Sequence, residues 1–259
     1  MALAGATPVP SRWRRQFLGW CVHFYTALGL VAAAAIAVLL VQGGAESYRR
    51  IFFLMVVATL IDATDGTFAR WVRVKEVLPG FDGRRLDDLV DFLTYTCLPL
   101  LLLWRAAILP PNCEAVLLLP LLASAYGFCQ TSVKTDDGYF LGFPSYWNLV
   151  AFYLYVLQPL PVGFALGIVV GFALLTFVPS RYLYPSQRGR LNRVTNLLGA
   201  LWTLLLVCII WNMPDDATRP LAVLSLFFPA WYLMASWIIS VRYWRRKRRR
   251  CEPMRTVLS

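Results

Sequence analysis

Apolar residues form long uninterrupted runs along most of this chain, and short clusters of proline, glycine and charged residues separate the runs. A helix of about 20 apolar residues is long enough to cross the hydrocarbon core of a bilayer. The breaks predict about eight membrane-spanning helices, near residues 17–42, 51–71, 86–106, 114–132, 146–159, 162–179, 195–213 and 220–242. We therefore expect an all-α polytopic membrane protein with a single membrane-embedded domain over residues 1–259.

The composition supports this class and excludes an ordinary soluble domain, because 59% of the residues are hydrophobic and only 15% are charged. The first apolar run is far longer than the core of a signal peptide, which has about 7–15 residues, so we expect it to be retained as a span. The six cysteines are scattered without paired spacing. They are expected to be buried apolar side chains rather than disulfides or metal ligands.

The distribution of basic residues predicts the orientation. If the N-terminus is cytosolic and the spans alternate, all basic residues except Arg49, Arg50, Arg105 and Arg219 lie on the cytosolic side. Cytosolic loops of membrane proteins carry such an excess, so both termini are expected in the cytosol.

The basic tail, 242–259, directly follows the last span. We expect it to contact anionic headgroups, where each basic residue contributes about 1 kcal/mol, rather than nucleic acid.

Half of the fourteen acidic residues lie between Asp62 and Asp91, around the end of the second expected span and the start of the third. A carboxylate at membrane depth costs about 3 kcal/mol unless something compensates it. Asp62 and Asp65 are three residues apart and Asp87 and Asp91 are four apart, so each pair shares a helix face. Antiparallel helices would bring both pairs together, where the carboxylates repel unless cations lie between them. Oxygen ligands of this kind suit Mg²⁺ or Mn²⁺.

The other three acidic residues of this segment have a simpler interpretation. Glu76, Asp82 and Asp88 are expected to cap helices or to pair with the arginines around them. Asp88 points about 100° away from Asp87 around the helix, so it should miss the cluster.

Small residues beside the acids indicate that a ligand approaches the helix. Gly66 follows Asp65 inside the second span, where glycine costs about 1 kcal/mol relative to alanine. Ala69 keeps the same face shallow, and Arg70 offers paired donors that suit a phosphate. Acidic metal ligands, a shallow helix face and an arginine together suggest a metal-bound diphosphate.

The acidic segment resembles the signature of the CDP-alcohol phosphotransferase family at every fixed position, which here reads Asp62-x2-Asp65-Gly66-x2-Ala69-Arg70-x12-Gly83-x3-Asp87-x3-Asp91. The resemblance implies a site at the cytosolic face in which the four aspartates hold two Mn²⁺ or Mg²⁺ ions. It implies that Asp91 is also the base that takes the proton of the acceptor hydroxyl. Gly66, Ala69 and Gly83 correspond to positions that leave room for the cytidine nucleotide. Homodimers are usual in the family, so the resemblance implies a homodimer.

Longer segments resemble the branch of this family that uses choline as the acceptor. They are VHFYTALG at 22–29, ARWVRVKEVLP at 69–79, LDDLVDFLTY at 86–95 and KTDDGYFLGFPSYWNLV at 134–150. This resemblance implies that choline reacts with CDP-diacylglycerol to give phosphatidylcholine and CMP, with Mn²⁺ preferred. It also implies a bacterial inner membrane as the location.

Choline carries a permanent cation, so its pocket is expected to be aromatic, with a carboxylate nearby. The candidates at the cytosolic face are Tyr95, Asp136, Asp137, Tyr139, Phe140, Tyr146 and Trp147. Tyrosine and tryptophan also collect at the interfaces of any membrane protein, so each has a structural alternative. His23, one turn inside the first span, is either a core histidine or a substrate contact.

Two alternatives remain. Relatives that use serine share the metal signature and a Gly-x-Pro element like Gly142-Phe143-Pro144, so serine is the other plausible acceptor. A cation transporter would place carboxylates near the midplane and build broken helices into two related halves. Here the acids lie near one face and the chain has no internal repeat, so an enzyme is favoured.

Overall fold

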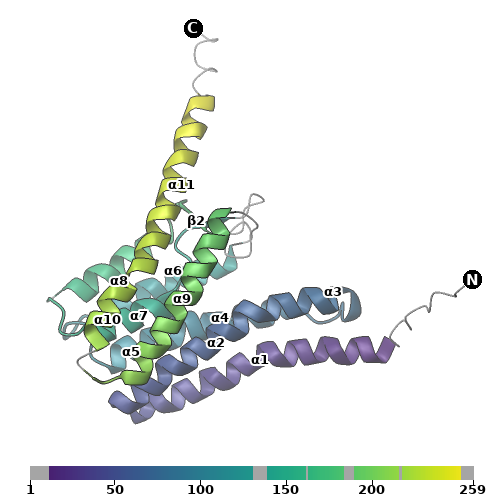
Figure 1. The fold of residues 1–259 in the computed structure, drawn as a ribbon, viewed down its shortest axis with the longest axis horizontal. Coiled ribbons are helices and arrows are strands. Elements are labelled where there is room, and N and C mark those ends of the chain that lie inside the picture. The colour runs from purple at the N-terminus through teal and green to yellow at the C-terminus, as the bar shows by residue number, and fades with distance from the viewer. Residues whose placement is uncertain (1–11, 131–138, 162, 184–189, 216–217, 252–259) are drawn as a thin grey trace, which may run out of the picture.

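The computed structural model describes residues 12–130, 139–161, 163–183, 190–215 and 218–251, and these residues are mostly helical (Figure 1). The first half contains α1 (Arg12–Gln42), α2 (Ala45–Val72), α3 (Val74–Val77), α4 (Gly83–Asp91), the π-helix η1 (Phe92–Cys97), α5 (Leu98–Arg105), the 3₁₀-helix η2 (Glu114–Leu117) and α6 (Leu118–Cys129). The second half contains β1 (Tyr139–Leu141), α7 (Trp147–Val156), α8 (Phe164–Leu175), β2 (Arg181–Leu183), α9 (Arg190–Asn212), α10 (Thr218–Ser225) and α11 (Phe227–Cys251).

Four helical segments in the described part of the chain are long and apolar enough to cross a membrane. They are Arg12–Gln42, Ala45–Val72, Arg193–Asn212 and Thr218–Arg246. The prediction of a helical polytopic membrane protein is confirmed at this level. Figure 1 shows α1 and α2 side by side, with α11 running at a steep angle to them.

Three of the expected spans correspond to shorter apolar helices, Glu114–Cys129, Trp147–Val156 and Phe164–Leu175. α7 has 10 residues and α8 has 12. At 1.5 Å per residue these helices are about 15 and 18 Å long, against a hydrocarbon core of about 30 Å. Trp147, Ala151 and Leu154 of α7 are buried in the protein core. The helices within 146–159 and 162–179 are therefore shorter than the sequence predicts, and α7 is largely buried against other helices.

The expectation of a purely helical chain is wrong for a small ribbon of two strands. β1 pairs antiparallel with β2, and Phe140 lies opposite Tyr182. The backbone N–H of Arg181 donates to Ser240 Oγ on α11 at 2.7 Å. A strand edge inside a membrane protein needs such a partner, because its backbone groups otherwise lose their hydrogen bonds. The ribbon joins the segment before α7 to the segment after α8 and attaches both to α11.

Two glycines of α1 lie directly against the segment that carries the acidic residues. A Cβ added at Gly19 would lie 2.8 Å from Leu78 Cδ1. A Cβ added at Gly29 would collide with Val90 Cγ1. These glycines therefore allow α1 to approach both ends of the segment 78–90. This packing fixes α4 beside α1 and α2.

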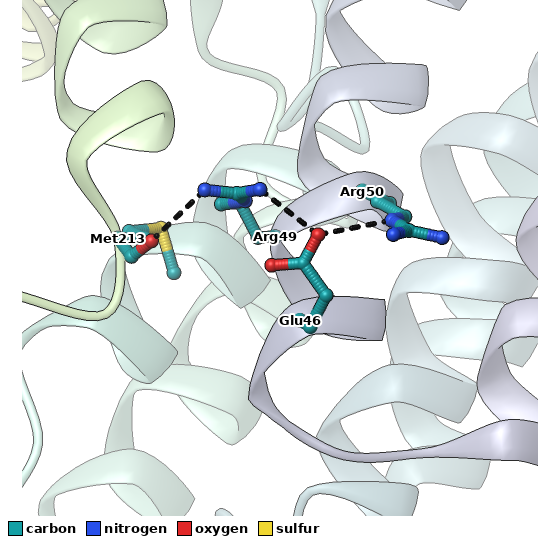
Figure 2. Close-up of polar contacts among 4 residues, drawn as sticks. All are labelled: Glu46, Arg49, Arg50 and Met213. Atoms are coloured by element: carbon teal, nitrogen blue, oxygen red, sulfur yellow. Dashed lines mark hydrogen bonds and ion pairs between the residues drawn. The ribbon is translucent and has the colours of Figure 1, made fainter.

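A small ionic cluster lies at the first turn of α2 (Figure 2). Glu46 Oε1 accepts hydrogen bonds from Arg49 Nη2 at 2.9 Å and from Arg50 Nε at 3.0 Å. Arg49 Nη1 also donates to the carbonyl of Met213 at 3.5 Å, which ties α2 to the end of α9. The sixteen residues from Glu46 to Asp62 place this cluster roughly 24 Å along the helix from the aspartates. The two arginines therefore lie at the opposite end of α2 from the acids.

Candidate metal centre

Three of the four expected aspartates meet where α2 and α4 approach each other. Asp62 on α2 and Asp87 and Asp91 on α4 each offer a carboxylate oxygen, and these oxygens lie within 4.8 Å of one another. Asp82 caps α4 by accepting the backbone N–H of Arg85 at 3.2 Å. The i, i+4 spacing then places Asp87 and Asp91 on one face of α4, toward Asp62.

The chemistry of this cluster fits a hard divalent cation. Two like charges about 4 Å apart repel by about 4 kcal/mol at an effective dielectric constant of about 20, so three carboxylates at this distance need a compensating cation. Asp91 Oδ1 is buried and has no hydrogen-bond partner among the described residues. A buried acceptor of this kind is costly unless a partner satisfies it. Carboxylate oxygens are the ligands that Mg²⁺ and Mn²⁺ prefer.

The side chain of Asp65 does not join the group of Asp62, Asp87 and Asp91. Its side chain is 6% exposed, and its Oδ2 accepts a hydrogen bond from Thr26 Oγ1 on α1 at 2.8 Å. It lies outside the group of three that the described residues form. Thr26 is a contact that the sequence analysis did not assign, although a hydroxyl on the buried face of an apolar span was a signal for it. A ligand role for Asp65 stays a prediction.

Loss of the Thr26 hydroxyl is expected to destabilise the fold. Thr26→Val keeps the shape of the side chain but leaves the buried Asp65 carboxylate without this donor, which costs about 1–3 kcal/mol. Thermal unfolding of the purified protein measures this loss. Thr64→Val is the matched control, because the Thr64 hydroxyl is exposed and bonds to Tyr25 at 2.8 Å. Equal losses in the two variants would contradict the importance of the Thr26–Asp65 bond.

The expected nucleotide residues occupy one end of α2 and the start of α4. A Cβ added at Gly66 would lie 3.3 Å from Arg70 Nη1, and Arg70 Nη2 donates to Thr67 Oγ1 at 3.0 Å. Ala69 is half-buried and Arg70 is exposed. Gly66 thus lies beside the Arg70 guanidinium, and a role of this end of α2 in nucleotide binding stays a prediction.

Gly83 and His23 touch each other, which the sequence analysis did not predict. A Cβ added at Gly83 would lie 2.8 Å from His23 Nδ1, so Gly83 makes room for the imidazole in this structure. The ring centroid of His23 lies 4.4 Å from that of Phe81 and 5.9 Å from that of Trp20. His23 is buried, and its Nε2 has no hydrogen-bond partner in the described part of the chain. His23 is thus a packed histidine whose hydrogen bonding is incomplete.

One of the acceptor candidates, Tyr95, contacts the metal centre, and a second, Tyr146, lies next to Tyr95. Tyr95 Oη donates to Asp62 Oδ2 at 2.7 Å. The ring centroid of Tyr146 lies 6.3 Å from that of Tyr95, and Tyr232 on α11 follows at 6.2 Å from Tyr146. Tyr232 could not be predicted from the sequence, because only the tertiary fold brings α11 to this place. An aromatic row therefore starts at the aspartates.

The other acceptor candidates have different surroundings. Trp147 is fully buried, and its Nε1 donates to Ser124 Oγ at 2.9 Å. Tyr139 belongs to β1, and the guanidinium of Arg181 lies 5.4 Å from its ring centroid. The structure thus places Trp147 in the core and Tyr139 in the ribbon. Asp136 and Asp137 lie outside the described residues.

The interpretation of the remaining acids is confirmed. Glu76 pairs with Arg73 at 4.0 Å, Asp82 with Arg85 at 3.2 Å and Asp88 with Arg84 at 4.0 Å. All three pairs are exposed and are expected to contribute less than about 1 kcal/mol each. Cys21, Cys97, Cys113, Cys129 and Cys208 are free, as expected, but the expectation of burial is wrong, because Cys21, Cys129 and Cys208 are exposed.

Comparison with known proteins identifies the family of the chain. No protein-family model matches the chain. A phosphatidylcholine synthase of Legionella pneumophila is 36% identical over 237 residues, which cover 88% of this chain and 90% of the relative. Phosphatidylcholine synthases of Pseudomonas aeruginosa and Borreliella burgdorferi are each 31% identical, over 88% and 85% of this chain and 92% and 93% of the relatives. The chain therefore belongs to the phosphatidylcholine synthase family.

Proposed function

We propose that this chain transfers the phosphatidyl group of CDP-diacylglycerol to choline, which gives phosphatidylcholine and CMP. The observation that carries the chemistry is the convergence of Asp62, Asp87 and Asp91 within 4.8 Å at the meeting of α2 and α4. The relatives named phosphatidylcholine synthase support the product.

The aspartates would hold the metal. We propose two Mn²⁺ or Mg²⁺ ions, with Asp62, Asp87 and Asp91 as ligands and Asp65 as the fourth. Divalent ions at such a site would neutralise the negative charge of a diphosphate. They would also stabilise the charge that develops on its leaving group. Arg70, exposed at the same end of α2, would bind a phosphate oxygen through its guanidinium. Gly66 and Ala69 keep the helix surface open for the nucleotide.

Asp91 is proposed to act as the base. Its buried Oδ1 would accept the proton of the choline hydroxyl as the choline oxygen bonds to the phosphorus that carries diacylglycerol. The bond from this phosphorus to the CMP oxygen breaks in the same transfer, so CMP leaves with the electron pair. Tyr146, beside the metal centre, offers an aromatic face to the trimethylammonium group.

The proposed setting is the inner membrane of a bacterium, with about eight spans, both termini in the cytosol and the aspartates at the cytosolic face. The excess of basic residues on that side supports this orientation, as does the place of Arg49 and Arg50 at the other end of α2. A lipid donor fits this place, because its acyl chains stay in the bilayer while its nucleotide reaches the cytosol. We propose a homodimer on the family resemblance.

Purified protein with CDP-diacylglycerol and Mn²⁺ tests the reaction when choline and serine are offered separately. CMP release is expected with choline and not with serine, and mass spectrometry should identify phosphatidylcholine as the lipid product. Release with serine alone would contradict the acceptor and leave the chemistry intact. No CMP release with either acceptor would contradict the proposed chemistry.

A further inference from the structure

A tyrosine contacts one of the three aspartates directly. Tyr95 Oη donates to Asp62 Oδ2 at 2.7 Å, and the tyrosine side chain is 8% exposed. A bond of this length between a hydroxyl and a carboxylate is typical of the stronger, charge-assisted hydrogen bonds. The hydroxyl of Tyr95 is therefore hydrogen-bonded to the carboxylate of Asp62 at the metal centre.

The local backbone that carries Tyr95 is unusual. Asp91 ends α4, and the next six residues form the π-helix Phe92–Cys97, in which the Leu98 N–H donates to the Leu93 carbonyl. π-helical turns are rare and occur frequently at functional sites. The wider turn changes the angular position of every later side chain relative to Asp91. Within this turn, Tyr95 lies four residues after Asp91 and reaches Asp62 on α2.

We infer that Tyr95 is a positioning residue that orients Asp62 for metal binding, rather than a contact for the acceptor. This inference rests on the proposed function, because it concerns the same metal site. A hydrogen bond to one oxygen restricts the rotation of a carboxylate and so fixes where its oxygens point. Loss of such a partner typically lowers metal affinity by a factor of about 10–100.

Tyr95→Phe tests this role, with Mn²⁺ alone as the probe. Thermal unfolding of the full-length protein is followed over a Mn²⁺ titration without substrates. The Mn²⁺ concentration for the half-maximal shift is expected to rise about 10–100-fold in the variant. The Mn²⁺ concentration for half-maximal CMP release should rise in parallel, with an unchanged KM for choline.

Tyr153→Phe is the matched control. Tyr153 is also buried, and its hydroxyl bonds to Ser225 Oγ at 2.8 Å and accepts from Trp202 Nε1 at 2.9 Å, with no role in the proposed site. It is expected to lower the unfolding temperature without moving the Mn²⁺ midpoint. In an Asp62→Asn background, Tyr95→Phe should have no further effect on that midpoint, because the two residues act as a unit.

The outcomes separate the alternatives. A Mn²⁺ midpoint for Tyr95→Phe within twofold of the wild type would overturn the positioning role. A raised KM for choline with unchanged Mn²⁺ dependence would overturn it in favour of an acceptor contact. A wild-type protein without any Mn²⁺-induced shift would contradict the metal site itself, and with it the proposed function.

Discussion

Asp91→Asn is expected to slow CMP release by a factor of about 10²–10⁴, which is the usual contribution of a general base. Asparagine keeps the size of the side chain but cannot accept the proton of the choline hydroxyl. It also removes one of the three carboxylates that lie within 4.8 Å of one another. The rate is measured as initial CMP release at saturating choline and CDP-diacylglycerol, over a range of Mn²⁺ concentrations.

The same helix, α4, provides the control for Asp91. Asp88 lies on the same helix but pairs with Arg84 at 4.0 Å in an exposed position. Asp88→Asn should therefore keep the rate within about twofold, because an exposed pair contributes only about 0–1 kcal/mol. Asp91→Asn is also expected to leave the metal-free protein at least as stable as the wild type, since it relieves repulsion between carboxylates. Turnover that survives Asp91→Asn unchanged would eliminate the base role.

Removal of divalent cations is expected to abolish CMP release and to lower the unfolding temperature. A ligand at 100 times its dissociation constant stabilises a folded protein by about 2.7 kcal/mol. For a chain of this size, that corresponds to a difference of about 5–10 °C. Purified protein is treated with a chelator, dialysed and unfolded with and without Mn²⁺, and CMP release is assayed before and after Mn²⁺ is restored.

A substitution of one aspartate tests whether the cation needed for CMP release binds at the group of Asp62, Asp87 and Asp91. Asp87→Asn should reduce the difference in unfolding temperature between the Mn²⁺-loaded and metal-free forms, whereas Asp88→Asn should preserve it. The two residues are neighbours on α4, and only Asp87 belongs to the group of three. Full activity in the presence of the chelator would contradict a divalent cation in the reaction. Equal Mn²⁺-induced shifts in both variants would place the cation elsewhere.

The pairing of Asp87 and Asp91 was accessible from the sequence because helix geometry alone determines it. Residues four apart on a helix lie about 40° apart around its axis, so both carboxylates point the same way. Asp62 and Asp65 are three apart and differ by about 60° in the other direction. In the structure this difference decides their partners, because Asp62 joins α4 whereas Asp65 bonds to Thr26 on α1. The sequence shows the Thr26 hydroxyl in an apolar span, but it does not show that this hydroxyl faces Asp65.

Other features depend on contacts between distant parts of the chain. The ribbon pairs Tyr139 with Leu183, and strands of three residues show no measurable alternation of apolar and polar positions. α7 has the same apolar composition as a lipid-exposed span, yet it is buried by protein. A hydrophobic pattern reports burial and does not distinguish lipid from protein as the surrounding medium. The π-helix after Asp91 has no pattern of its own, so the approach of Tyr95 to Asp62 was not predictable.

The packing of α1 has a consequence for the order in which the protein is built. The contacts that hold the aspartates in place, from Gly19 on Leu78 to Thr26 on Asp65 and Tyr95 on Asp62, all join residues among the first 95. These residues are synthesised before the ribbon at Tyr139 and before Tyr232, whose ring lies beside that of Tyr146. The metal centre is therefore a local structure that a nascent chain can form early. The aromatic row from Tyr95 through Tyr146 to Tyr232 is completed only with the C-terminal helix.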